Sequence, residues 1–95
     1  MRVTWDEGKN QENRWKHGLS FEEARALFAR SDYLEIFDEI HSESEDRFIA
    51  IGPIARGLVV VVWTERDDET VRIISARWAT EREKTLYHSY MDERL

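Results

Sequence analysis

Two β-branched runs separated by three acidic residues constrain the fold of this chain more than any other feature. The run "GLVVVVWTER" covers residues 57–66 and the run "TVRIISARW" covers 70–78, with Asp67, Asp68 and Glu69 between them. Apolar runs of this length, bounded by polar turn residues, are typical of neighbouring strands. The sequence therefore predicts an antiparallel pair of strands joined by a tight turn at 67–69.

The second run also carries the charges that raise the question of function. In a regular strand its side chains alternate between two faces, one with Arg72, Ile74, Ala76 and Trp78, the other with Val71, Ile73, Ser75 and Arg77. Arg72 and Arg77 are thus expected on opposite faces unless a bulge intervenes. Arg66 and Arg77, with a tryptophan nearby, are suited to hold a phosphate while a base stacks on the indole. The alternative is that these arginine stems only lie over the sheet, and spacing alone leaves both readings open.

The rest of the chain alternates short strands with helices. "RVTWD", "YLEIFDE" and "RFIAIG" have the pattern of strands. Helices are expected near 7–17, ending at Gly18, near 20–30 and near 80–92. Ser20 with Glu23, and Thr80 with Glu83, have the spacing of capping boxes. The order β-α-α-β-β-β-β-α predicts an α+β fold, a mainly antiparallel sheet of four or five strands with helices packed on it.

The amino-acid composition limits which kinds of protein and which kinds of site are possible. Ninety-five residues suit a single domain, 1–95, and the absence of cysteine excludes disulfides, thiolate zinc sites and a cysteine nucleophile. The formal charge of −6 argues against nonspecific nucleic-acid binding. Residues 1–45 hold 6 Lys and Arg against 11 Asp and Glu, whereas residues 46–85 hold 7 against 7. The arginines of the second stretch are the plausible anion-binding set.

Neither a membrane nor a secretory location is expected. The opening "MRVTWDEGKN" lacks the apolar stretch of a signal peptide, and the apolar run "GLVVVVW" is too short to span a bilayer. We therefore expect a cytoplasmic protein.

Three short features are candidates for chemistry. His17, His41 and His88 are scattered, so no metal site is expected. The cluster "HSESEDR" at 41–47 suits a solvated hairpin, or a carboxylate base with Arg47 holding an anion. Lys16 and His17 suit the negative end of a helix dipole, or acid–base work by the histidine. The local signals do not decide among these alternatives.

Taken together, three segments closely resemble the sequence blocks of the BrnT family. They are "WDEGKNQENRWKHGLSFEEA", "HSESEDRFIAIG" and "VRIISARWATEREKTLY". The resemblance extends from Trp5 to Tyr87, and the patterns "KHG.SFEEA" and "RIISAR.A...E...Y" occur in the family's order and spacing. BrnT proteins are toxins of type II toxin–antitoxin systems with a RelE-like fold.

The resemblance implies a growth-arresting endoribonuclease that cleaves messenger RNA. It implies attack by the RNA's own 2′-hydroxyl, without a metal or cofactor, and neutralisation by a BrnA-type antitoxin that reads operator DNA through a ribbon-helix-helix element. By block position, the residues implied in catalysis are His17, Glu45, Arg66 and Arg77. Lys16, Arg47, Arg72 and Glu83 also occupy matching positions. The residues expected to bind RNA are Lys16, Arg47, Arg72, Trp78 and Arg82.

Two departures from the family pattern bear on RNA binding. Trp78 stands where family members often have a second basic residue, and the last helix mixes Glu81, Arg82, Glu83 and Lys84 where others have several arginines. With the acidic net charge, this favours a weak or ribosome-assisted nuclease. The alternative is a module that engages the antitoxin and its operator, as a co-repressor, with little nuclease activity.

Overall fold

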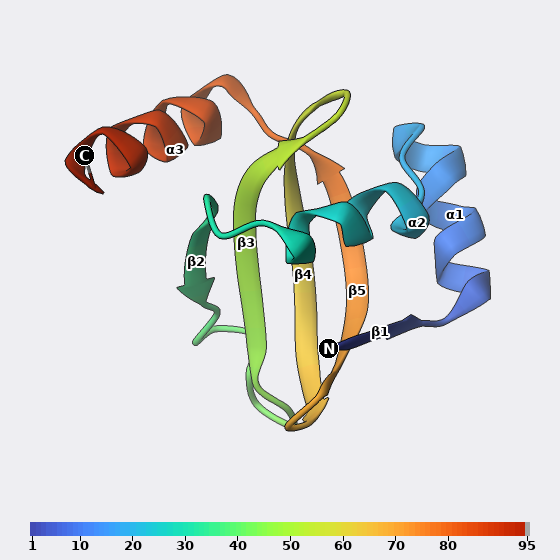
Figure 1. Ribbon diagram of the computed structural model, residues 1–95. Coiled ribbons are helices and arrows are strands. Elements are labelled where there is room, and N and C mark those ends of the chain that lie inside the picture. The colour runs from blue at the N-terminus through green and yellow to red at the C-terminus, as the bar shows by residue number, and fades with distance from the viewer. Residues whose placement is uncertain (95) are drawn as a thin grey trace.

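The predicted pair of strands forms the centre of the sheet (Figure 1). In the computed structural model, which describes residues 1–94, β4 (Gly57–Asp67) and β5 (Thr70–Trp78) are antiparallel neighbours. β3 (Arg47–Ile54) pairs antiparallel with β4, and β2 (Leu34–Phe37) pairs antiparallel with β3. β1 (Arg2–Trp5) joins the other edge, parallel to β5, which gives the order β1-β5-β4-β3-β2. The α+β class is confirmed, as a five-stranded mixed sheet with helices.

The helices lie close to their expected positions, with one correction. α1 (Glu7–His17) ends at Gly18, whose φ of 63° is the left-handed conformation that favours glycine. The single helix expected over 20–30 is instead a short α2 (Phe21–Ala24) followed by a 3₁₀ helix, η1 (Arg25–Ala29). Such tightening is frequent at helix C-termini, and here it coincides with the residues that pack on the sheet. α3 (Glu81–Arg94) starts after Thr80 and runs slightly beyond the expected end.

The sheet buries one face fully and the other only in part. α2 and η1 cross the first face, which Figure 1 draws in front, and enclose the larger core with Val59, Val61 and Trp63 of β4. The second face carries a smaller core of Leu34, Ile51, Val60, Ala79 and Tyr87, where α3 packs near β2 and β3. Both capping boxes form, at Ser20 with Glu23 and at Thr80 with Glu83. The half of the second face beyond α3 remains open.

A β-bulge in β5 changes the expected direction of one arginine. Ser75 pairs with Val62 and Ile73 pairs with Trp63, so Ile74 is an extra residue in the ladder. As a result Arg72 lies opposite Thr64 and Arg77 opposite Val60. Thr64 and Val60 are four residues apart on β4 and share a face. Arg72 and Arg77 therefore lie on the same face of the sheet, the partly open one, and the regular alternation expected for β5 is wrong beyond Ile73.

Two buried asparagines attach α1 to the rest of the molecule. The Asn10 carbonyl oxygen accepts from the Phe21 backbone N–H at 2.8 Å. Asn13 donates to the Leu19 carbonyl at 2.8 Å and accepts from the Ala76 N–H of β5 at 3.2 Å. Ala76 lies beyond the segment of β5 that pairs with β1, so Asn13 satisfies an edge N–H that has no strand beside it. No local pattern in the sequence indicated this role for the two asparagines.

Candidate functional site

The open half of the second sheet face carries four charged residues that we call the arginine cluster. They are Glu45, Arg47, Arg66 and Arg72. Arg47 begins β3 opposite Thr64, and Thr64 lies opposite Arg72 on β5. Arg66 comes two residues after Thr64, and a register shift between Glu65 and Asp67 leaves it as an extra residue at the end of β4. Three adjacent strands thus bring their arginines to one end of the face.

A single carboxylate lies between two of these arginines. Glu45 Oε1 is 3.9 Å from a terminal nitrogen of Arg47, and Glu45 Oε2 is 3.8 Å from a terminal nitrogen of Arg66. These distances are too long for hydrogen bonds. The Arg47 Nε is buried without a hydrogen-bond partner, and Arg72 takes part in none of the ion pairs found among residues 1–94. The buried Nε is out of reach of solvent, but the partly exposed side chains of Arg47, Arg66 and Arg72 give the arginine cluster positive charge to offer an anion.

Thr64 fixes the loop that carries Glu45. Its side chain is buried, and its hydroxyl donates to the Asp46 carbonyl at 2.7 Å. This bond ties the β2–β3 loop to β4 beside Arg47. Thr64 was not among the site residues expected from the sequence. The sequence did contain a signal for Thr64: it is the one hydroxyl residue in a row of aliphatic residues, Leu58, Val60 and Val62, on the same face of β4.

Arg77 lies at the other end of β5 and is already paired. Its two terminal nitrogens donate to the two Glu83 oxygens, both at 2.7 Å. Glu83 also accepts from the Thr80 N–H at 2.8 Å, which closes the capping box of α3. The Arg77 guanidinium lowers the pKa of Glu83 from 4.5 to about 2. Arg77 thus joins β5 to α3, and the structure does not bring it together with the arginine cluster.

Trp78 lies on the opposite face, packed against the larger core. Its indole N–H donates to the His17 carbonyl at 2.8 Å, and the Arg56 guanidinium lies 5.0 Å from its ring centroid. Arg56 in turn makes a bidentate pair with Glu23 and donates to the Gly18 carbonyl at 2.7 Å. Trp78 holds the end of α1, and the arginine cluster lies on the other side of the sheet.

Lys16 and His17 line a small hollow between α1 and β5. The other residues around it are Lys9, Glu12, Asn13, Ile74 and Ser75. Ser75 is exposed and lies three positions after Arg72 on β5. Arg82 is exposed in the first turn of α3. The site residues expected from the sequence therefore divide into the arginine cluster, this hollow, and the residues that anchor α1 and α3.

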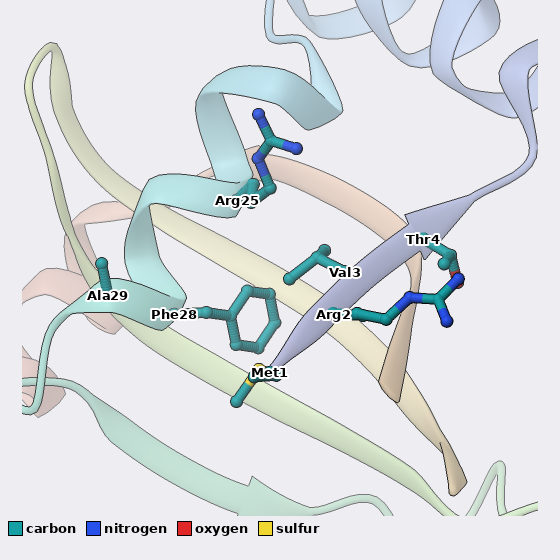
Figure 2. Close-up of a pocket in the computed structure, with 7 residues that line it drawn as sticks. All are labelled: Met1, Arg2, Val3, Thr4, Arg25, Phe28 and Ala29. Atoms are coloured by element: carbon teal, nitrogen blue, oxygen red, sulfur yellow. The ribbon is translucent and has the colours of Figure 1, made fainter. Parts of the chain in front are cut away.

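A wider hollow lies on the covered face, between β1 and η1. Figure 2 shows Val3 and Phe28 facing one another across it, while the Arg2 guanidinium is directed away from Phe28. The Arg25 guanidinium at its rim lies 5.5 Å from the Trp5 ring centroid. Polar and apolar side chains both line this hollow, which lies on the face opposite the arginine cluster and so does not extend that cluster.

Neither metal ligands nor a membrane span is found in the part of the chain that the structure describes. No three His, Asp or Glu side chains converge there as metal ligands. His41, in the acidic loop, instead forms a hydrogen bond between its Nδ1 and Asp38 Oδ2, 2.9 Å apart. No helix among the described residues is long and apolar enough to cross a bilayer.

Comparison with known proteins decides the family. A family model described as the ribonuclease toxin BrnT of type II toxin–antitoxin systems matches residues 5–83. The chain belongs to the BrnT family. The resemblance inferred from the three sequence blocks is confirmed, and a BrnT toxin implies ribonuclease activity and an antitoxin partner. A comparison with curated protein sequences gives no match.

A solved BrnT structure agrees with the fold. The 1.1 Å crystal structure of the Brucella abortus ribonuclease toxin BrnT superposes with a TM-score of 0.67 at 28% sequence identity. The match covers 85% of this chain and 99% of the Brucella chain. The five-stranded mixed sheet with its helices is therefore the architecture of a BrnT toxin.

Proposed function

We propose that this BrnT-family toxin cleaves messenger RNA at the arginine cluster, by attack of the RNA's own 2′-hydroxyl. The observation that carries the proposal is the group of three arginines on adjacent strands, of which Arg66 has a side chain 50% exposed and Arg72 is in no ion pair among residues 1–94. Guanidinium groups match phosphate oxygens geometrically and keep their charge at every physiological pH. An exposed RNA phosphate is the anion that fits a ribonuclease toxin.

The chemistry is set by the charges on this face. Glu45 accepts the proton of the 2′-hydroxyl, the 2′-oxygen bonds to phosphorus, and the bond from phosphorus to the 5′-oxygen breaks. The 5′-oxygen leaves after taking a proton from solvent, and the product carries a 2′,3′-cyclic phosphate. Arg47, Arg66 and Arg72 bind the phosphate oxygens as negative charge develops on them. Because fixed guanidiniums supply this charge stabilisation, the proposed reaction proceeds without a metal ion.

The proposed partners rest on family membership and charge. The antitoxin is of the BrnA type, with a ribbon-helix-helix element, and operator DNA is reached only through it. The acidic net charge of −6 limits affinity for free RNA, so the proposed substrate is mRNA made accessible on the ribosome, in the cytoplasm.

Purified chain incubated with RNA tests the proposal. We expect cleavage that is unchanged by EDTA and leaves 2′,3′-cyclic or 3′-phosphate ends. Glu45→Gln keeps the size of the side chain and removes the base, so its cleavage rate falls by about 10²-fold. A 5′-phosphate product, or full activity of folded Glu45→Gln, contradicts the mechanism.

A second function has its own observation. Trp15 is 90% exposed on α1 and Ile40 is 80% exposed in the β2–β3 loop, and large exposed apolar side chains are common in protein interfaces. They favour a module that engages the antitoxin as a co-repressor. Expressing the chain alone separates the two functions, because growth arrest results from the nuclease and not from a co-repressor.

A further inference from the structure

The hollow between α1 and β5 is lined by two lysines, Lys9 and Lys16, that make no ion pair among residues 1–94. Lys9 and Lys16 are seven residues apart, two helical turns, and so lie on one side of α1. Both side chains are exposed, and none of the ion pairs among residues 1–94 includes Lys9, Lys16 or His17. Of the described residues that line the hollow, Glu12 alone is acidic. The hollow therefore has a net positive charge on an acidic protein.

The end of α1 does not explain these cations. Basic residues in a last turn are usually explained by the exposed carbonyls there. Here the His17 carbonyl accepts from the Trp78 indole, and the Gly18 carbonyl accepts from Arg56. The donors that stabilise this helix end come from β5 and the β3–β4 turn, so Lys16 and His17 remain available to a ligand.

The wall opposite α1 is built by the bulge of β5. β1 pairs with β5 only as far as Ile73, and Asn13 binds the Ala76 N–H. Within residues 1–94, therefore, no strand lies beside Ile74 and Ser75 on that edge. Ser75 is exposed and lies opposite Val62, on the same face as the arginine cluster. The Ser75 hydroxyl thus adds an uncharged donor at the rim of the hollow.

We infer that this hollow is a second phosphate subsite, in which Lys9, Lys16 and Ser75 bind a backbone phosphate of the RNA away from the scissile bond. The inference rests on the proposed function. Ser75 and Arg72 lie opposite Val62 and Thr64, which are two residues apart on β4, so they are about 7 Å apart along the sheet. A stacked strand rises about 3.4 Å per nucleotide, so a phosphate bound at Ser75 is about two nucleotides from the scissile phosphate at the arginine cluster.

Substrate length provides the test. Lys9→Gln and Ser75→Asp are compared with wild type on a dinucleoside monophosphate, which occupies only the arginine cluster, and on an octanucleotide RNA. Each substitution lowers kcat/KM on the octanucleotide about fivefold more than on the short substrate, through KM. Lys84→Gln, which removes the same charge from α3, is the matched control and gives no such difference. Equal losses on both substrates, or none on either, overturn the inference.

Binding of an uncleavable octadeoxynucleotide separates this inference from the nuclease proposal. The slope of log affinity against log salt becomes shallower by about 0.7 in Lys9→Gln, because one phosphate contact is lost. If wild type cleaves no RNA, the proposed function fails, and this slope still decides on the subsite. An unchanged slope in Lys9→Gln overturns it.

Discussion

The two ends of β5 carry arginines on the same face in opposite circumstances. Arg77, near α3, donates to both oxygens of Glu83 at 2.7 Å. Arg72, at the far end, has no ion pair within residues 1–94 and belongs with Arg47 and Arg66, which lie 3.9 and 3.8 Å from Glu45 oxygens. Both arginines belong to the same sequence block, so membership of a motif does not tell an anchoring arginine from one available to a substrate. What distinguishes the two arginines is how closely a carboxylate lies to each of them.

The difference arises from the origin of the carboxylate at each end. After Arg77, the capping box of α3 fixes the Glu83 carboxylate on the Thr80 N–H and aims it back at β5. At the other end, the carboxylate comes from the β2–β3 loop, which Thr64 attaches through the Asp46 carbonyl rather than through Glu45 itself. One end is closed by secondary structure, whereas the other is left open to ligands.

The largest effect is expected at the open end. Arg72→Ala removes a donor to the developing phosphate charge, and losing one such donor slows a reaction by about 10²–10³-fold. RNA cleavage and growth arrest both fall, while the melting temperature stays near that of wild type. Arg72→Lys recovers only part of the activity, because lysine lacks the planar fork. Full toxicity of folded Arg72→Ala would remove this end from the catalytic site.

Asn13→Ala tests how far the closed end depends on α1. The substitution leaves the Leu19 carbonyl and the Ala76 N–H without their partners in buried surroundings. Each unpaired group costs about 1–3 kcal/mol, so the free energy of unfolding in urea should fall by at least about 2 kcal/mol. A loss below about 0.5 kcal/mol would mean that water replaces both bonds.

Arg77→Ala is expected to weaken the fold more than the reaction. The Arg77 side chain is 43% exposed and that of Glu83 is 23% exposed. Solvent screening therefore limits the loss to about 1 kcal/mol, measured by denaturation. Cleavage by the folded fraction stays within about tenfold of wild type, well short of the 10²–10³ expected for a lost catalytic donor. A folded Arg77→Ala that cuts no RNA would instead make Arg77 a catalytic residue.

The smallest effect is a pH dependence of the same pair. The pKa of Glu83 falls from 4.5 to about 2 on folding because Arg77 hydrogen-bonds its charged form. A lowered carboxyl pKa contributes stability above the unfolded value, and the contribution is lost as pH falls through the folded value. Stability thus declines between about pH 4.5 and 2 by roughly 1 kcal/mol after screening. In Glu83→Gln this part of the decline is absent, and acid titrations that superpose with wild type would contradict the assignment.

Short-range signals in the sequence predicted most of the fold. The turn after Asp67, the stop at Gly18 and both capping boxes depend on residues within a few positions of one another, and all of them form. The 3₁₀ conformation of η1 was missed because helical spacing does not tell α from 3₁₀ in a single short turn. η1 also packs on the sheet through Phe28, whose ring centroid lies 5.1 Å from that of Trp63. These two residues are far apart in the chain, so local spacing could not predict their contact.

The candidate site was less accessible to prediction. The cluster "HSESEDR" pointed to Glu45 and Arg47, because both lie within one loop and the strand after it. The direction of Arg72 depends on the extra residue Ile74, which two-residue alternation cannot reveal. Trp78 and Arg77 had the composition of a binding surface, but their partners, the His17 carbonyl and Glu83, are set by tertiary structure.

The parallel pairing of β1 with β5 also bears on how the toxin is made. Among residues 1–94, β1 pairs with β5 alone, since Arg2–Trp5 pair with Thr70–Ile73, so this early strand has to wait for a much later one. At about 5–20 residues per second, several seconds of synthesis separate the two strands. Arg72 belongs to that later strand, so the arginine cluster is assembled only after most of the chain has been translated. The proposed nuclease site is therefore complete only when synthesis of the chain is nearly finished.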